Sequence, residues 1–406
     1  MKLVQFGAGN IGRSFIGQVF SRAGWEVVFV DVDQTLVSRL IEKRFYSVVV
    51  KREGKPNEKR RIGPVRAIDG KNAQAAAKEI ADADLIATSV GKAALPKIFP
   101  VIALGLNERF KLSPEKPLDI IIAENARGAD KLFRDSIKRD MAIKYSGSSY
   151  PFDKLVGLVE TSIGKMVPIM KREDLEADPL QLFAEEYEDL IVDRRGFKGP
   201  LPDIAALKPV DPIAAYVDRK LFIHNLGHAA AAYLGYQAMG SPPRYHSPSQ
   251  GLLAGVFELN EVEEAVRCAM NEAAEALVLE YPDSYTRADL THYIDDLLLR
   301  FKNKALGDTI HRVGRDLERK LGREDRLVGA MLLCARHKLP FNSIAHVYKA
   351  ALGFVAPDER GVPWPDDASF KAGFADWGLS WVFSCVSSLS ETEEIDQIVM
   401  ASLEKS

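Results

Sequence analysis

The chain has 406 residues, of which 47% are hydrophobic and 27% are charged, and its formal net charge is −3. One hydrophobic core rarely supports this length, so we expect two domains. The nearly balanced charge includes no basic block of the kind that binds nucleic acid, which disfavours that class of partner.

The chain has three cysteines, far apart in the sequence, that form neither a CxxC pair nor a disulfide framework. We therefore expect core cysteines in a reducing compartment. The first strand is expected to begin at residue 3, and no apolar run reaches the ~20 residues that span a bilayer. These features predict a cytoplasmic protein with no membrane partner, and we expect a monomer or a weak dimer.

An apolar strand leads directly into a glycine-rich turn at the start of the chain. Residues 3–12 read LVQFGAGNIG, and their glycines follow the spacing G-x-G-x-x-G. An amphipathic helix is predicted over 11–23, and a second strand over 27–30 ends on Asp31. A strand, a glycine turn, a helix and a carboxylate about 20 residues further on together predict a dinucleotide-binding βαβ unit.

The residues of this unit have distinct physical roles. Gly7 permits the tight turn, Gly9 lets the backbone approach a pyrophosphate, and Gly12 lets the helix pack against the strand. The helix N-terminus offers N–H groups and a positive dipole end to phosphates. Asp31 is expected to bind the adenosine ribose and repel a 2′-phosphate, which predicts NAD; alternatively, it caps a turn. The predicted cofactor-binding residues here are Gly7, Gly9, Asn10, Ile11, Gly12 and Asp31.

Strands and helices continue to alternate up to residue 193. Helices are predicted over 35–43 and 72–81, a hairpin over 46–65, and strands over 84–91, 120–123 and 190–193, with a strand and turn over 156–168. The alternation predicts a parallel sheet with its ligand beyond the carboxyl ends of the strands. Four residues at such ends are either cofactor-side candidates or ordinary connection residues. They are Val90, Gly91, Glu124 and Asn125.

A segment rich in glycine and proline, 196–202, is typical of a domain connector. From residue 211 the pattern changes to long helical periods, for example over 213–234 and 253–281. The sequence therefore predicts an α/β Rossmann-type domain with a parallel-rich sheet over 1–205 and a mostly α-helical domain over 206–406.

The start of the second domain carries an amine, an amide and an imidazole within nine residues, KLFIHNLGH, from Lys220 to His228. At about 100° per residue, Lys220, Asn225 and His228 fall within an arc of roughly 140°, so one broad helix face can present them to a small molecule. Geometry alone favours a simpler explanation, namely a solvated lysine and a satisfied histidine.

Several motifs together resemble the polyol-specific long-chain dehydrogenase/reductase family over nearly the whole chain. They are the glycine turn 7–13, Glu124-Asn125, Asp211-Pro-Ile, the Lys220–His228 segment, residues 313–321 and Asp325-Arg326. The resemblance implies an NAD-dependent oxidoreductase that interconverts D-mannitol 1-phosphate and D-fructose 6-phosphate.

The resemblance also implies the roles of the three side chains. Lys220 is the expected catalytic acid/base, Asn225 is expected to stabilise the reacting oxygen, and His228 is expected to orient substrate hydroxyls. A lysine suits proton exchange when burial and neighbouring cations lower its pKa. The histidines follow no metal-ligand spacing, so we expect no metal.

Substrate-side candidates complete the predicted site. Family members that act on non-phosphorylated mannitol have an asparagine where this chain has Glu160, which we expect to bind sugar hydroxyls or to hold Lys220. Arg312 and Lys320 match the family's substrate-contacting spacing and suit a sugar phosphate. On one helix Arg312, Arg315 and Arg319 would lie within about 60°, although a solvated, ion-paired face is an equal alternative for the last two. The predicted substrate-binding residues are Glu160, Asp193, Arg312 and Lys320.

Two alternatives to this function remain. A hexuronate reductase of the same family, acting on fructuronate or tagaturonate, would bind its substrate carboxylate with the same cations. A non-catalytic NAD-sensing protein would use the first domain alone, since fold does not determine function. The complete set of Lys220, Asn225 and His228 favours an enzyme, because a sensor needs no proton donor.

Overall fold

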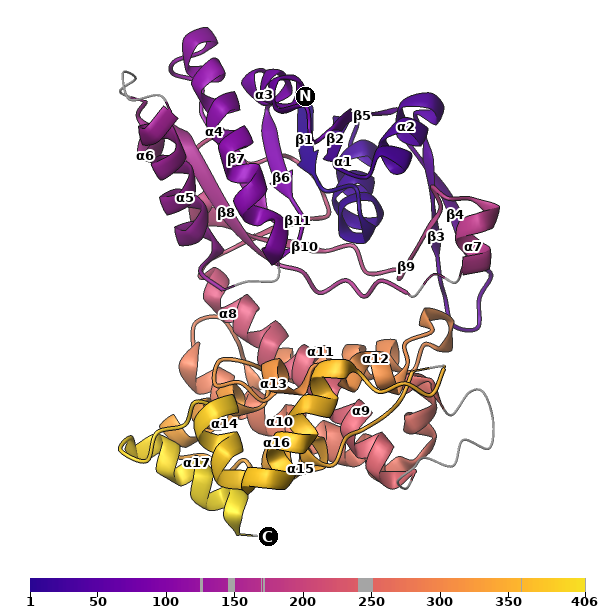
Figure 1. Ribbon diagram of the computed structural model, residues 1–406, viewed down its shortest axis with the longest axis vertical. Coiled ribbons are helices and arrows are strands. Elements are labelled where there is room, and N and C mark those ends of the chain that lie inside the picture. The colour runs from indigo at the N-terminus through magenta and orange to yellow at the C-terminus, as the bar shows by residue number, and fades with distance from the viewer. Residues whose placement is uncertain are drawn as a thin grey trace. The chain divides into compact units, whose positions relative to one another are not determined.

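The structure, a computed structural model, describes residues 1–124, 127–144, 150–168, 170, 172–239, 251–358 and 360–405. The chain forms two compact units, Met1–Val217 and Asp218–Ser406 (Figure 1). The division falls within helix α8 (Ile213–Arg219).

The first unit is built around a sheet that has eight strands in the described residues, in the order β11-β10-β8-β7-β6-β1-β2-β5. Neighbouring strands pair in parallel, apart from β10, which pairs antiparallel with β8. The predicted Rossmann-type domain with a parallel-rich sheet is confirmed. The strands are β1 (Lys2–Phe6), β2 (Glu26–Asp31), β5 (Val65–Asp69), β6 (Leu85–Thr88), β7 (Leu118–Ile122), β8 (Val156–Ser162), β10 (Leu190–Asp193) and β11 (Leu207–Val210).

Helices cover both faces of this sheet, which explains why its central strands are apolar throughout. Leu3 and Phe29 belong to one hydrophobic core, and Val4 and Val30 belong to the other. Figure 1 shows α4 and α5 beside β7 and β8. The helices of this unit are α1 (Gln18–Arg22), α2 (Gln34–Lys43), α3 (Ala73–Ala81), α4 (Leu95–Leu112), α5 (Ala129–Lys144), α6 (Phe152–Leu155) and α7 (Arg172–Ala177).

A smaller sheet adjoins the helix that follows the glycine turn. Strands β3 (Tyr46–Val50) and β4 (Glu58–Ile62) pair antiparallel, as the predicted hairpin requires, and β9 (Leu182–Ala184) pairs in parallel with β3. The Tyr46 hydroxyl donates to the carbonyl of Arg13 at 2.7 Å, which ties this sheet to that helix.

The segment 196–202 does not connect the two units, contrary to our expectation. It lies within the first unit, between β10 and β11, which pair with each other. A Cβ at Gly196 would lie 2.5 Å from the Leu158 carbonyl oxygen, so glycine permits close packing on β8. The Asp119 carboxylate accepts hydrogen bonds from the backbone N–H groups of Lys198 and Gly199, at 2.7 and 3.1 Å. The glycines serve tight packing here rather than a flexible link.

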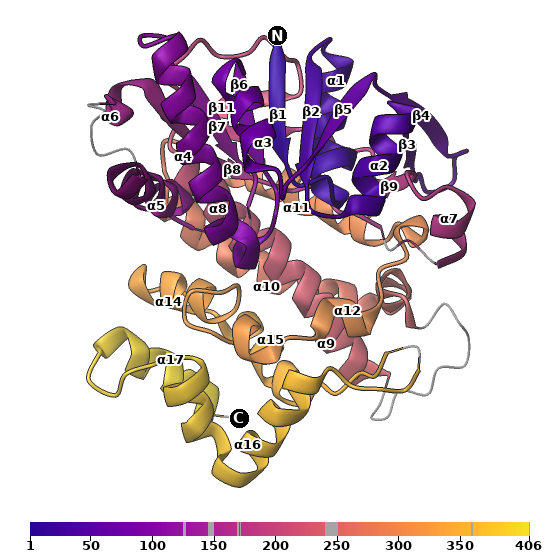
Figure 2. The same cartoon turned by 45° about the horizontal axis from the view of Figure 1, so that its top comes forward.

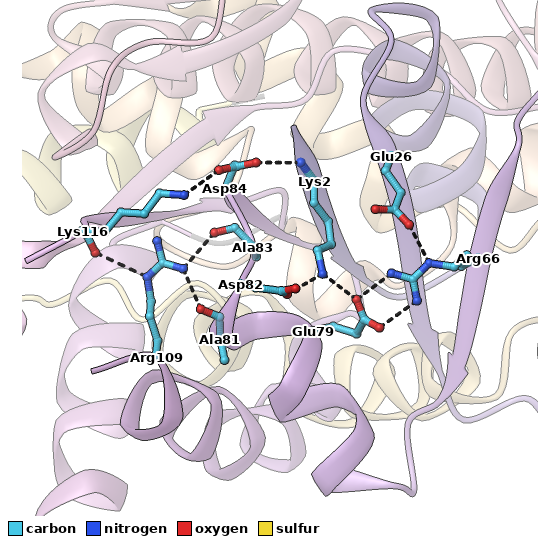
Figure 3. Close-up of polar contacts among 10 residues, drawn as sticks. All are labelled: Lys2, Glu26, Arg66, Glu79, Ala81, Asp82, Ala83, Asp84, Arg109 and Lys116. Atoms are coloured by element: carbon cyan, nitrogen blue, oxygen red, sulfur yellow. Dashed lines mark hydrogen bonds and ion pairs between the residues drawn. The ribbon is translucent and has the colours of Figure 1, made fainter. Parts of the chain in front are cut away.

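Ion pairs hold the amino end of the parallel strands together (Figure 3). Lys2 Nζ lies 2.9 Å from Glu79 Oε2 and also pairs with Asp82. Arg66 forms a two-pronged pair with Glu79, each bond 2.7 Å long, and a further bond of 2.6 Å to Glu26. These contacts join the starts of β1, β2 and β5 to the end of α3.

The second unit is mostly helical, as predicted (Figure 2). Val266, Met270, Ala273 and Leu277 of α10 are fully buried at helical spacing, so this helix presents a continuous core face. The helices are α9 (Leu226–Ala238), α10 (Asn260–Glu280), α11 (Arg287–Phe301), α12 (Ile310–Gly314), α13 (Leu317–Lys320), α14 (Val328–Arg336), α15 (Asn342–Leu352), α16 (Pro365–Trp381) and α17 (Glu394–Glu404).

The cysteines are only partly as expected. Cys334 is buried in α14, but Cys268 and Cys385 are exposed, so two of the three are not core residues. Cys268 lies on the outer face of α10, whose helical period turns it away from the buried positions. Within the described ranges, we find no helix with both the length and the apolarity that a bilayer crossing requires.

Candidate functional site

The glycine turn connects β1 to a helical segment that begins at Asn10, continues as a π-helical turn over Gly12–Gly17 and leads into α1. Gly7 has φ +89°, and a Cβ there would lie 2.5 Å from the Ser89 carbonyl oxygen; a Cβ at Gly12 would lie 2.0 Å from the Gly7 oxygen. Chain packing therefore requires these two glycines. A Cβ at Gly9 would meet no described atom within 4 Å, so a ligand approaching this exposed backbone would explain that glycine.

The next residues of this set lie at the same turn. Ile11 is half-buried and Asn10 is exposed, at the helix N-terminus, where backbone N–H groups have no partner within the helix. Asp31, the last residue of β2, accepts from the N–H groups of Ala8 at 2.6 Å and Asp33 at 3.0 Å. Its carboxylate thus shapes the glycine turn and caps a turn of its own, while it remains partly exposed beside the helix N-terminus.

Three of the strand-end candidates meet in one place. Glu124 is 7% exposed, and its two carboxylate oxygens accept from the N–H groups of Val90 at 2.8 Å and Gly91 at 2.9 Å. Burial raises the pKa of Glu124, and these two bonds oppose that rise. Asn125, the fourth candidate, lies outside the described residues.

The acidic substrate candidates of the first unit both cap helices. Glu160 Oε1 accepts from the N–H of Ala129 at 2.8 Å, at the start of α5, and Asp193 Oδ1 accepts from the N–H of Arg195 at 3.0 Å. Burial raises the pKa of each carboxyl group, and Asp130 adds to the rise in both. The two therefore share one acidic environment, and their role toward a substrate stays a prediction.

Lys220 and Asn225 begin and end a π-helical turn, Lys220–Asn225, between α8 and α9. Such turns are frequent at functional sites. A Cβ at Gly227 would lie 2.5 Å from Met270 Sδ, so this glycine lets the segment approach α10 closely. Burial and the nearby charge of Arg326 lower the pKa of Lys220 to about 8, although Asp325 opposes the shift. The role of Lys220 as acid/base stays a prediction.

His228 belongs to a second group of contacts, one turn further along. Its ring stacks on Phe301 with centroids 5.0 Å apart, and its Nε2 lies 3.4 Å from Asp308 Oδ2. Asp308 also pairs with Arg312. Burial raises the pKa of Asp308, but His228 and Arg312 outweigh that effect and lower it. Asp308 thereby joins the expected hydroxyl-orienting group to an expected phosphate ligand.

Lys320 lies in a different environment from the one we expected. It is 4% exposed, and its Nζ donates to the carbonyls of Val313, at 2.6 Å, and Arg315. Burial and the charges of Arg326 and Arg319 lower its pKa to about 6. The substrate roles of Lys320 and Arg312 stay predictions.

The basic segment is not one helix. Helices α12 and α13 are separate, because Asp316 between them has φ +73° and Asp367 of α16 accepts from the N–H groups of Asp316 at 3.1 Å and Leu317 at 2.7 Å. The three arginines therefore do not share one helical face. Arg315 instead lies 4.3 Å from the ring centroid of Trp364.

Sequence reasoning missed Asp308, and it named Arg326 only as part of the Asp325-Arg326 motif, without its contact in this site. Asp308 precedes Arg312 by four residues, a spacing that signals a helical ion pair and could have pointed to it. Arg326 contacts the carbonyl of Asn225 from 101 residues away, and no local pattern carries that information. Among the residues that the structure describes, no group of three or more His, Cys, Asp or Glu side chains is arranged to hold a metal ion.

The fold and these two groups of residues define a protein with a doubly wound dinucleotide-binding unit and a helical unit that carries a lysine of lowered pKa. Family models described as the mannitol dehydrogenase Rossmann domain and the mannitol dehydrogenase C-terminal domain match residues 1–206 and 212–376. The chain belongs to the mannitol dehydrogenase family, a family of oxidoreductases.

Curated relatives named mannitol-1-phosphate 5-dehydrogenase are similar over nearly the full chain. One from Bacillus subtilis (strain 168) is 34% identical and the alignment covers 99% of this chain and 100% of the relative. One from Brevibacillus brevis is 32% identical over 93% of this chain and 91% of the relative.

Solved structures share the fold at lower identity. A substrate-free D-sorbitol dehydrogenase has a TM-score of 0.74 at 17% identity, covering 98% of this chain and 91% of its own. Pseudomonas fluorescens mannitol 2-dehydrogenase, in a ternary complex with NAD and D-mannitol, has a TM-score of 0.71 at 15% identity, with coverage of 99% and 91%.

Proposed function

We propose that this protein is an NAD-dependent dehydrogenase that interconverts D-mannitol 1-phosphate and D-fructose 6-phosphate, with Lys220 as the acid/base. The observation that carries the proposal is the place of Lys220 at the start of a π-helical turn, where burial of its amine and the charge of Arg326 lower its pKa to about 8. The curated relatives of that name, similar over nearly the full chain, support the choice of substrate.

The first unit fits the cofactor. Open space at Gly9, the helix N-terminus at Asn10 and the carboxylate of Asp31 are together suited to a dinucleotide with an unphosphorylated ribose. When bound, NAD takes a hydride from the alcohol carbon, and NADH returns one to the ketone. The fold shared with a mannitol 2-dehydrogenase that was solved with NAD agrees with this assignment.

The second unit supplies the proton chemistry. In the oxidation direction, neutral Lys220 accepts the hydroxyl proton as the C–H hydride leaves; in reduction, the ammonium form donates it back. The Asn225 amide donates to the reacting oxygen without changing charge. His228, stacked on Phe301 and facing Asp308, orients a neighbouring hydroxyl.

The phosphate assignment rests on the cations of the second unit. Arg312 is 39% exposed in its side chain and pairs with Asp308, so its guanidinium keeps solvent-facing area that a phosphate can use. Lys320 is buried on two carbonyls, which makes Arg312 the stronger of the two candidates.

A substrate panel tests the proposal. We would follow NADH absorbance with fructose 6-phosphate, fructose, fructuronate and tagaturonate, at equal concentrations. The proposal predicts a preference for fructose 6-phosphate over fructose of more than tenfold in kcat/KM, because one charge-assisted contact contributes roughly 1.5–3 kcal/mol. A preference for a hexuronate would instead establish the carboxylate-sugar reductase, and no turnover with any sugar, despite NADH binding, would favour a sensor.

A further inference from the structure

Arg326 connects the segment before α14 to the π-helical turn. It is 8% exposed, and its Nη1 donates to the carbonyl oxygen of Asn225 at 3.3 Å. A Cβ at Gly329 would lie 2.8 Å from the ring of Phe222, so this glycine lets α14 begin directly against the turn. The Arg326 bond and the packing of Gly329 on Phe222 therefore both hold this part of the chain against the Lys220–Asn225 turn.

Arg326 shares its carboxylate partner with a second guanidinium group. Asp325 Oδ1 accepts from Arg326 Nε at 2.7 Å, while Asp325 Oδ2 accepts from Arg319 Nη1 at 3.1 Å. One carboxylate thus serves two guanidinium groups, although Arg319 also pairs with Asp316. The two guanidinium groups and the two carboxylates therefore balance in number, and Arg326 bonds the π-helical turn directly.

We propose that Arg326 is a positioning residue for Lys220, which holds the carbonyl end of the π-helical turn and keeps a permanent positive charge beside the amine so that the neutral, proton-accepting form is populated. This inference rests on the proposed role of Lys220 as acid/base. When two cations lie close together, the group with the lower pKa, here the lysine, loses its proton more readily, and a guanidinium stays charged at every working pH.

The direction of the Lys220 pKa agrees with this role, because Arg326 lowers it and Asp325 raises it. Other charged or titratable groups surround the turn. Arg219 lies 4.2 Å from the Tyr293 ring, and Asp218 accepts from the Tyr281 hydroxyl at 2.7 Å. Burial lowers the pKa of His224, and Arg300 of α11, His228 and Arg326 lower it further. Arg326 itself donates to the turn's terminal carbonyl, that of Asn225.

The test measures the pKa of Lys220 directly in variants of Arg326. Protein labelled with ¹³Cε-lysine would be titrated by NMR, and the Lys220 signal would be assigned by its loss in Lys220→Ala. We expect Arg326→Gln to raise the pKa by about one unit, whereas Arg326→Lys, which keeps the charge, stays within a few tenths. Circular dichroism would check that each variant is folded.

A second variant has the opposite expected sign. Asp325→Asn removes the carboxylate that favours the ammonium form, so the pKa of Lys220 should fall below the wild-type value. If Arg326→Gln does not fold, the Lys220 pKa measured in Asp325→Asn becomes the test of the proposal. An unchanged Lys220 pKa in folded Arg326→Gln, or a rise in Asp325→Asn, would overturn the proposal.

The NMR titration does not depend on turnover, so it separates this inference from the proposed function. In an active enzyme, the pH at which polyol oxidation reaches half its plateau should move upward in Arg326→Gln and remain near the wild-type value in Arg326→Lys. If the Lys220 pKa shifts in Arg326→Gln but the wild type turns over none of the sugars, the role of Arg326 is supported and the proposed function is refuted. A merely structural role for Arg326 would lower turnover without moving the pH profile.

Discussion

Lys2 and Lys220 are the same residue type in opposite electrostatic environments. At the amino end of the sheet, burial acts against the charged amine of Lys2, but Asp82 and Glu79 outweigh it and raise its pKa (Figure 3). In the second unit, burial and Arg326 lower the pKa of Lys220 to about 8. The first lysine is held as a cation that ties β1 to the end of α3, and the second has a lowered pKa, as the proposed acid/base requires.

The difference shows that burial and neighbouring charges, rather than residue type, decide in which direction the pKa of a lysine moves. At the amino end, carboxylates equal or outnumber the cations that they meet, as in the Glu79 pair with both Lys2 and Arg66. Beside Lys220, one carboxylate is shared by two guanidinium groups. Substitutions of Lys2, in its ion-pair cluster, and of Lys220, the proposed acid/base, should therefore have different effects on turnover and stability.

The largest expected effect is on turnover. Lys220→Ala should lower kcat by at least about a thousandfold while NADH binding persists, because it removes proton transfer and leaves the first unit intact. Lys2→Ala is the matched control, and its kcat should remain within about twofold of wild type once it is folded. Steady-state rates with fructose 6-phosphate and NADH titration by fluorescence provide the measurement. Similar losses in both variants would break the comparison.

The cofactor preference is the next largest effect. Asp31→Ala should narrow the preference for NADH over NADPH by about tenfold or more, since the carboxylate repels a 2′-phosphate and binds ribose hydroxyls. Asp33→Ala, which removes the N-cap of α2 two residues further on, is the control and should keep the preference. Equal use of both cofactors by the wild type would refute the assignment of Asp31.

The pH dependence of stability should reveal Lys320. Its folded pKa, about 6, lies below the ordinary value of 10.5, so between these values the unfolded chain binds a proton that the folded chain does not. This lysine therefore adds stability as pH rises, by up to about 1.4 kcal/mol per pH unit. Urea unfolding at pH 6.5 and pH 8 should show a smaller rise in Lys320→Met than in wild type. Parallel curves would mean that Lys320 stays charged.

The smallest expected effect concerns the amino end of the sheet. Arg66 and Lys2 lower the pKa of Glu79 to about 2, although burial opposes them, so its contribution is present above pH 4.5 and is lost as pH falls toward 2. Glu79→Gln should destabilise the protein by about 1 kcal/mol at pH 7 and by less at pH 3. Chemical denaturation at the two pH values would show it. A loss that is equal at both would indicate that packing, not charge, is the cause.

The sequence alone predicted those parts of the fold whose determining residues lie close together in the chain. The glycine spacing, the strand before it and Asp31 predicted the βαβ unit, because each requirement lies within about 30 residues. The apolar runs of β6 and β7 predicted buried parallel strands for the same reason. The family resemblance, not periodicity, singled out Lys220, since helical spacing alone also fits a solvated lysine.

The features that the sequence did not predict depend on contacts between residues that are far apart in the chain. The segment 196–202 has the composition of a linker, yet its glycines pack against β8 and Asp119. The break between α12 and α13 depends on Asp367, about 50 residues away, which binds two N–H groups at the turn. Likewise, the pKa of Lys220 depends on Arg326, whose place beside the π-helical turn is decided by tertiary packing.

The pH dependence of D-mannitol 1-phosphate oxidation tests the central claim most directly, because it reports the protonation state of the group that accepts the proton. For the wild type, the logarithm of kcat/KM should rise with a slope of one below a pH of about 8 and level off above it, as neutral Lys220 accumulates. The residual activity of Lys220→Ala should lack that transition. A wild-type profile without the transition, or the same transition retained in Lys220→Ala, would contradict the assignment of Lys220 as the acid/base.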